Sequence, residues 1–136
     1  MFFKKEKNEA NDLAKVAALL IHAAKIDENF SKNEQAIIKQ ALLQIGANDQ
    51  DLEKIFFDGK KIEENSNQIL EFTKEVKNME ENKKIKIVET LWRIIYSNNE
   101  ADIYESNLMR RLAGLLYVDS KIMGDIKEKI KNENSK

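Results

Sequence analysis

The chain has 136 residues, 42% of them hydrophobic and 35% charged, and its 23 basic and 24 acidic side chains give a net charge of −1. This length predicts a single domain over 1–136, with an ordered core over about 9–132. The balanced charge argues against a nucleic-acid-binding protein, and the absence of cysteine excludes disulfides, thiolate zinc sites and cysteine nucleophiles.

The apolar residues recur at helical spacing along the whole chain, which has no proline and only four glycines. No segment of useful length alternates apolar and polar residues, so we expect an all-α protein without a sheet. In chain order the pattern predicts about seven helices, over roughly 9–26, 32–45, 50–58, 62–77, 79–97, 103–116 and 120–132. Because residues 60–68 are polar, the alternative to a fourth helix over 62–77 is a loop followed by a shorter helix over 68–77.

Capping residues predict where several of these helices begin and end. Asn48 or Asp49 can cap the short third helix and Asp119 the last one, while Gly46 and Gly59 stand where helices should stop. Three pairs have the spacing of a capping box, in which each cap side chain accepts from an N–H that is otherwise unpaired: Ser31 with Glu34, Asn78 with Glu81, and Asp102 with Glu105.

A helix–loop–helix motif occurs twice, over 17–42 and over 88–113. Each copy is an apolar helix, a short acidic loop and a second helix, and the alignment of the two copies pairs Glu34 with Glu105. This repetition predicts an internal duplication in which the two loops share a polar site near a pseudo-two-fold axis.

Oxygen-bearing side chains occupy alternate positions of both loops and the first turn of the following helix. This arrangement can direct several oxygens at one centre, as calcium requires, and magnesium is equally permitted through fewer carboxylates plus water. The candidate metal ligands are Asp27, Asn29, Glu34, Asn98, Glu100, Asp102 and Glu105. The competing interpretation is that these acids are helix caps and solvated loop residues.

The remaining residues give little support for catalysis. The sequence has no Ser–His–acid order with local context, no glycine-rich phosphate loop and no Cys/His cluster, so we expect no enzyme and no catalytic residue. His22 is interpreted as a partly buried structural residue, with the hypothesis that it borders the acidic site together with Glu89 and Arg93. Trp92 follows the core stripe of its helix.

An adaptor function is the main alternative to a binding site in the loops. The pair Phe56 and Phe57 predicts one inward and one surface-facing ring, which can mark a groove for a protein partner. The longest apolar run, 16–24, is too short to span a bilayer and no secretory signal is visible, so we expect a cytoplasmic protein.

The two loops and their helices resemble the tellurite-resistance TerB-like family from about residue 13 to at least residue 118. The segments IDENFSKNE (26–34) and SNNEADIYE (97–105) resemble the Asp-Gly–x–Phe/Leu–x–x–x–Glu motif of that family, and ETLWR (89–93) resembles its "EALWxxA" stretch. The tail RRLAGLLYV (110–118) agrees in order and spacing.

The resemblance implies an all-helical duplicated fold, a cytoplasmic or membrane-associated role in stress responses, an unidentified protein partner, and acidic loops that bind a divalent cation such as Ca²⁺ or Mg²⁺. Three departures from the family motif affect the expected cation site. Glu28 and Asn99 replace both glycines, whose backbones adopt positive φ at little cost, and Asn98 replaces an aspartate. A cation site here should therefore be weaker than in a fully matching relative.

Overall fold

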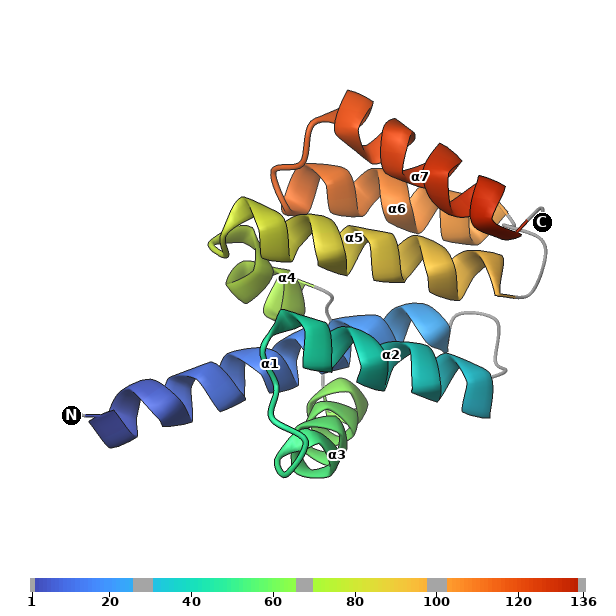
Figure 1. Cartoon of the computed structure of the whole chain (residues 1–136). Helices are drawn as coiled ribbons and strands as arrows, with labels where there is room; N and C mark the ends of the chain where they lie inside the picture. The colour runs from blue at the N-terminus through green and yellow to red at the C-terminus, as the bar shows by residue number, and fades with distance from the viewer. Residues whose placement is uncertain (1, 26–30, 66–69, 98–102, 135–136) are drawn as a thin grey trace.

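The computed structural model describes residues 2–25, 31–65, 70–97 and 103–134. Over these residues it contains seven helices and no strand, which confirms the all-α prediction (Figure 1). The helices are α1 (Phe2–Ala24), α2 (Lys32–Ile45), α3 (Leu52–Glu64), α4 (Leu70–Lys77), α5 (Glu81–Tyr96), α6 (Ile103–Leu115) and α7 (Ser120–Asn134).

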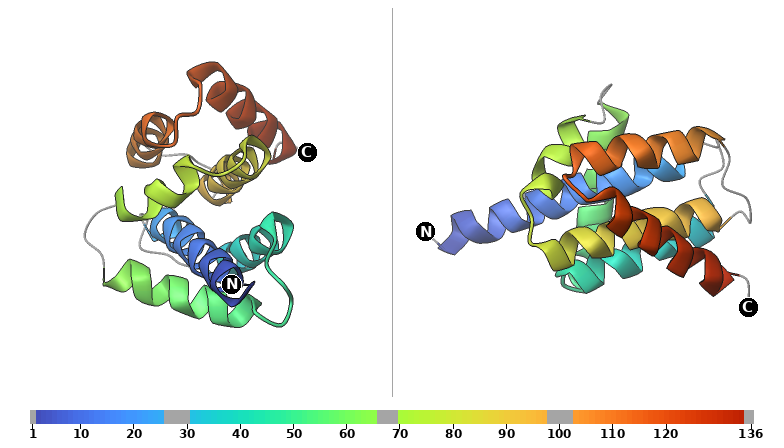
Figure 2. Two further views of the ribbon diagram at one scale, coloured as in Figure 1. Left: turned by 90° about the vertical axis from the view of Figure 1, so that its left-hand side faces the viewer. Right: turned by 90° about the horizontal axis from the view of Figure 1, so that it is seen from above.

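Helices α1 and α5 form the centre of the molecule and the others cover them (Figures 1 and 2). Helix α1 packs against α2, α3, α4 and α5, whereas α5 packs against α1, α2 and α7. Helix α4 contacts both α1 and α6, so it joins the part of the fold built on α1 to the part built on α5.

The second half of α1 is apolar on nearly every side because helices surround it. Six consecutive residues, Val16 to Ile21, are each at most 1% exposed. A helix that is apolar all round is expected only where neighbours cover all its faces, as they do here. The largest fully buried side chains of the core are Leu19, Leu20, Ile21, Ile38, Leu42, Phe72, Ile87, Leu91, Ile94, Ile95, Met109 and Leu112.

Gly59 lies inside α3 and does not end it, so the predicted stop at this residue is wrong. An alanine Cβ placed there would lie 2.6 Å from the Cβ of Ala17 and 3.0 Å from the carbonyl oxygen of Ala14. The glycine therefore permits close contact between α3 and α1. Because α3 continues to Glu64 and α4 begins at Leu70, a fourth helix over 62–77 is also wrong, and the shorter alternative is nearer.

Two of the predicted caps are confirmed. The side chains of Ser31 and Glu34 form a reciprocal capping box at the start of α2, and Asp119 Oδ1 accepts from the N–H of Lys121 at 2.7 Å at the start of α7. Gly46 ends α2 as predicted, with φ of 137° and its N–H bonded to the carbonyl of Leu42.

Other boundary predictions are wrong. Asn78 does not cap α5; its Nδ2 donates to the carbonyl of Lys74 in the last turn of α4. The residue before α3 is Asp51, not Asn48 or Asp49, and it makes no side-chain cap bond. Helix α1 begins at Phe2, well before the predicted residue 9. The Asp102–Glu105 cap falls outside the described side chains.

Helix α6 ends in a Schellman motif with Tyr117 in the position that glycine usually occupies. The N–H of Val118 bonds to the carbonyl of Ala113 and the N–H of Tyr117 to that of Gly114. Tyr117 has φ of 57° and is 69% exposed, and Lys77 Nζ lies 4.4 Å from its ring centroid. The left-handed backbone costs an L-residue about 1–2 kcal/mol, so this turn is strained.

We expect Tyr117→Gly to be more stable than Tyr117→Ala by about 1 kcal/mol, because only glycine adopts this φ without a Cβ penalty. In an ordinary helix interior the order is reversed, with alanine favoured by about 1 kcal/mol. Both variants lose the tyrosine ring and its contact with Lys77, so their comparison isolates the backbone. Chemical denaturation measures it, and equal stabilities would show that residue 117 is not left-handed.

Candidate functional site

Of the seven predicted metal ligands, only Glu34 has a described side chain. Its side chain is buried, with the residue 1% exposed. Oε1 accepts from both the N–H and the Oγ of Ser31 at 3.0 Å, and Ser31 Oγ accepts from the N–H of Glu34 at 3.1 Å. The capping role of Glu34 is therefore confirmed, and its role as a ligand stays a prediction.

The side chains of the other six predicted ligands lie outside the described part of the structure. Asp27, Asn29, Asn98, Glu100 and Asp102 lie outside the described residues, and Glu105 is described only as part of the backbone of α6. Among the side chains that are described, no three histidine or acidic groups come together in a way that would hold a metal ion.

The helix ends that border the two predicted loops do gather in one place. The end of α1, the start of α2, the end of α5 and the start of α6 all lie at the same end of the molecule, on the right in Figure 1 and in the right-hand view of Figure 2. The chain thus enters and leaves both loop segments at that end. This arrangement is the one that a site shared by the two loops requires.

His22 belongs to an ion-pair cluster between α1 and α3. Its Nδ1 lies 3.4 Å from Glu63 Oε2, and Lys25 Nζ donates to Glu63 Oε1 at 2.8 Å. The imidazole also packs against the ring of Phe72, with 6.1 Å between centroids. His22 is half-buried, as the sequence predicts for a structural residue.

Glu89 and Arg93 belong to a different cluster, between α5 and α7. The Glu89 carboxylate lies 3.5 Å from Arg93 Nη2 and 3.4 Å from Lys129 Nζ. Arg93 donates from Nε and Nη2 to the two oxygens of Glu133, both at 3.3 Å. In these contacts Glu89 and Arg93 have partners on α7, and His22 has its partner on α3. The loop residues that the three side chains would border lie outside the described residues, so the hypothesis stays a prediction.

Trp92 is buried in the core, as predicted. It is 3% exposed, and its indole N–H has no partner among the described groups. Its ring stacks on Tyr96 with 5.9 Å between centroids. Burial, and secondarily the nearby carboxylate of Glu128, raises the pKa of the Tyr96 phenol above its usual value.

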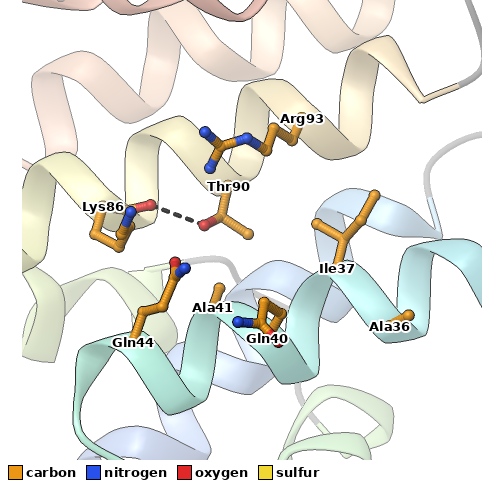
Figure 3. Close-up of a pocket in the computed structure, with 8 residues that line it drawn as sticks. All are labelled: Ala36, Ile37, Gln40, Ala41, Gln44, Lys86, Thr90 and Arg93. Atoms are coloured by element: carbon orange, nitrogen blue, oxygen red, sulfur yellow. Dashed lines mark hydrogen bonds between the residues drawn. The ribbon is translucent and has the colours of Figure 1, made fainter. Parts of the chain in front are cut away.

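A surface groove of about 440 Å³ runs between α2 and α5 (Figure 3). Its lining consists of Ala36, Ile37, Gln40, Ala41 and Gln44 from α2 and Lys86, Thr90 and Arg93 from α5. The lining combines apolar side chains, two amides and two cations, and it contains no carboxylate. Sequence reasoning missed this groove, because its walls are about fifty residues apart in the chain; the only local signal is an α2 face of alanine and glutamine without acids.

The predicted orientation of Phe56 and Phe57, one ring inward and one toward the surface, is confirmed. Phe56 is 5% exposed and packs in the core, whereas Phe57 is 55% exposed on the outer face of α3. Lys61 Nζ lies 4.7 Å from the Phe57 ring centroid and covers part of it. None of the described helices has the length and apolar character that a membrane-spanning segment needs.

A protein-family model matches most of the chain. The sequence model described as tellurite resistance protein TerB matches residues 13–128. The matched span starts in α1 and ends in α7, so it includes both copies of the helix–loop–helix motif. No curated protein and no solved structure matches the chain.

Proposed function

The chain belongs to the TerB family of tellurite resistance proteins, and we propose that it is a non-enzymatic module whose two inter-helix loops bind one divalent cation. The observation that carries the proposal is the gathering of four helix ends at one end of the molecule, which brackets both acidic segments (Figure 1). The proposed ligands are drawn from Asp27, Asn29, Glu34, Asn98, Glu100, Asp102 and Glu105, and the cation is Ca²⁺ or Mg²⁺.

Glu34 has two parts in this proposal. One carboxylate oxygen holds Ser31, which fixes the residue where the first loop enters α2. The carboxylate also brings a negative charge to the start of α2, where the loop ends. A cation bound by both loops would tie the α1–α2 connection to the α5–α6 connection, and its binding free energy would stabilise the packing of these helices.

The test is thermal unfolding of the chelator-stripped protein with and without millimolar Ca²⁺, repeated with Mg²⁺. A cation at about one hundred times its dissociation constant stabilises the folded state by about 2.7 kcal/mol, which raises the unfolding temperature by several degrees. We expect this rise in the native protein and its loss in the double variant Asp27→Asn, Glu34→Gln. Glutamine keeps the capping-box pattern, so the fold should survive the change.

The matched control is Glu53→Gln with Asp58→Asn, which removes the same two charges from α3. The Glu53 and Asp58 side chains are 76% and 41% exposed and pair only with lysines in the described contacts. The control should keep the full cation-dependent rise. The absence of any rise in the native protein, or an equal loss in both double variants, would contradict the proposal.

The alternative function is a protein-interaction adaptor in which the loop acids are only helix caps. The exposed ring of Phe57 and the confirmed capping role of Glu34 favour it. Because Phe56 is buried, only Phe57→Ala would test this surface without disturbing the core. If neither Ca²⁺ nor Mg²⁺ changes the unfolding temperature, this alternative becomes the leading one.

A further inference from the structure

We infer that the groove between α2 and α5 binds an acidic amphipathic helix of a partner protein. The inference uses none of the loop residues and is independent of cation binding. It rests on the shape of the groove, on its charge and on the way α7 already contacts α5.

The groove is bounded by one stripe of residues along each helix. The α2 stripe is formed by Ala36, Ile37, Gln40, Ala41 and Gln44, which cover about two turns of one helix face. The α5 stripe has Lys86, Thr90 and Arg93, at the spacing i, i+4, i+7. Two alanines leave room between the helices, so a partner helix can lay apolar side chains at similar spacing along the groove (Figure 3).

The charge of the groove selects an acidic occupant. The one carboxylate of α2, Glu34, is buried in its capping box, and Glu89 of α5 is paired with Lys129 of α7. The charged groups of the lining are Lys86 and Arg93, and Arg93 is already paired with Glu89 and Glu133. Lys86 makes no ion pair with any described residue, so its ammonium is available to a carboxylate from outside.

Helix α7 shows how a neighbouring helix pairs a carboxylate with a cation of α5. Its Glu133 accepts two hydrogen bonds from Arg93, through Nε and Nη2. Helix α7 covers α5 from one side, and the groove lies on the side of α5 that faces α2 (Figures 1 and 3). A partner helix with glutamates flanking its apolar stripe would pair with Lys86 as α7 pairs with Arg93.

The experiment measures fluorescence anisotropy of a labelled synthetic helix with leucines along one face and glutamates on both flanks. A second peptide has lysines in place of all the glutamates. We expect saturable binding of the glutamate peptide that weakens with added salt, and much weaker binding of the lysine peptide. Amide chemical shifts should move along α2 and α5.

The decisive variants change the groove from each wall. Lys86→Glu reverses the available charge, and Ala36→Glu fills the hollow from an exposed position where the fold tolerates a larger side chain. Each variant should lower the affinity for the glutamate peptide about tenfold or more. The matched control Lys60→Glu makes the same charge change on the exposed face of α3. It should leave the affinity for the glutamate peptide within about twofold of the native value, because a charge far from the groove acts only weakly through salt solution.

Any one of four results would overturn the inference. The glutamate peptide does not bind, or the lysine peptide binds as tightly; Lys60→Glu weakens binding as much as Lys86→Glu; or the protein forms a dimer that Lys86→Glu dissociates. The last result would assign the groove to a second copy of the chain.

Discussion

Replacing Gly59 with alanine is expected to destabilise the protein by about 1–2 kcal/mol, although alanine is the better helix former by about 1 kcal/mol. The added methyl would lie 2.6 Å from the Cβ of Ala17 and 3.0 Å from the carbonyl of Ala14. Neither atom can move without shifting the backbone of α1, and an overfilled contact in a packed core costs about 1–3 kcal/mol. Urea denaturation measures the change.

Gly124 provides the matched control because it also lies inside a helix but has open space around it. No atom lies within 4 Å of a Cβ built there. Gly124→Ala should therefore show the propensity gain alone and stabilise the protein by about 0.5–1 kcal/mol. The two glycine-to-alanine changes should have opposite signs, and a stabilising Gly59→Ala would mean that α1 and α3 are not in close contact.

A second change in α1 tests whether Ala17 is the obstacle. Ala17→Gly alone should cost about 1 kcal/mol or more, through lost helix propensity and a lost methyl contact. In the Gly59→Ala background the same change removes the clashing Cβ, so the double variant should be more stable than the sum of the single changes predicts. Additive effects would place the clash elsewhere.

Replacing Glu34 with alanine is expected to destabilise the protein by about 1–2 kcal/mol. The change removes two hydrogen bonds from Ser31 to a carboxylate, which are stronger than bonds between neutral groups, and half of the capping box at the start of α2. It also leaves unfilled space at a residue that is only 1% exposed. Thermal and urea unfolding in the presence of a chelator measure the loss without any contribution from a cation.

Two further variants separate the cap from charge alone. Glu34→Gln should cost less than about 1 kcal/mol, because glutamine can still accept from the N–H of Ser31. Glu81→Ala removes a glutamate from the first turn of α5, where the residue is exposed and the preceding Glu80 makes no cap bond. Its cost should be about 0.5 kcal/mol, the size of a helix-dipole effect. If Glu34→Ala costs no more than Glu81→Ala, the buried capping box does not stabilise α2.

The Glu34 variants also bear on the proposed cation site. A residue that is both cap and ligand should affect stability in two separable ways: one present in chelator and one that appears only with the cation. Glu34→Gln is the informative variant, because it largely keeps the contribution of the cap and weakens the contribution of the bound cation. A glutamate that acts only as a cap would give the same loss with and without Ca²⁺.

The helical fold class follows from local sequence. Apolar residues at helical spacing, the absence of proline and short-range caps act within a few residues, so the sequence alone predicts the helix content, the Ser31–Glu34 box, the Asp119 cap and the end of α2 at Gly46. The orientation of Phe56 and Phe57 follows for the same reason, since neighbours on a helix face different directions. The family also follows from the sequence, through the spacing of the two motifs.

Only the tertiary structure decided the features that depend on contacts between distant segments. Gly59 has the local signature of a helix end, but it is an interior residue of α3. Its close contact with Ala17, more than forty residues earlier, explains why a residue without a side chain stands there. Asn78 has the spacing of a cap for α5 but bonds to the end of α4. The groove exists because α2 lies beside α5, and within the described part of the chain Lys86 makes no ion pair, whereas Glu89 pairs with Arg93 and Lys129. Local patterns specify the helices. The packing of one helix on another decides which small, polar or charged side chains come into contact. These contacts join residues far apart in the chain, so no short segment of the sequence predicts them.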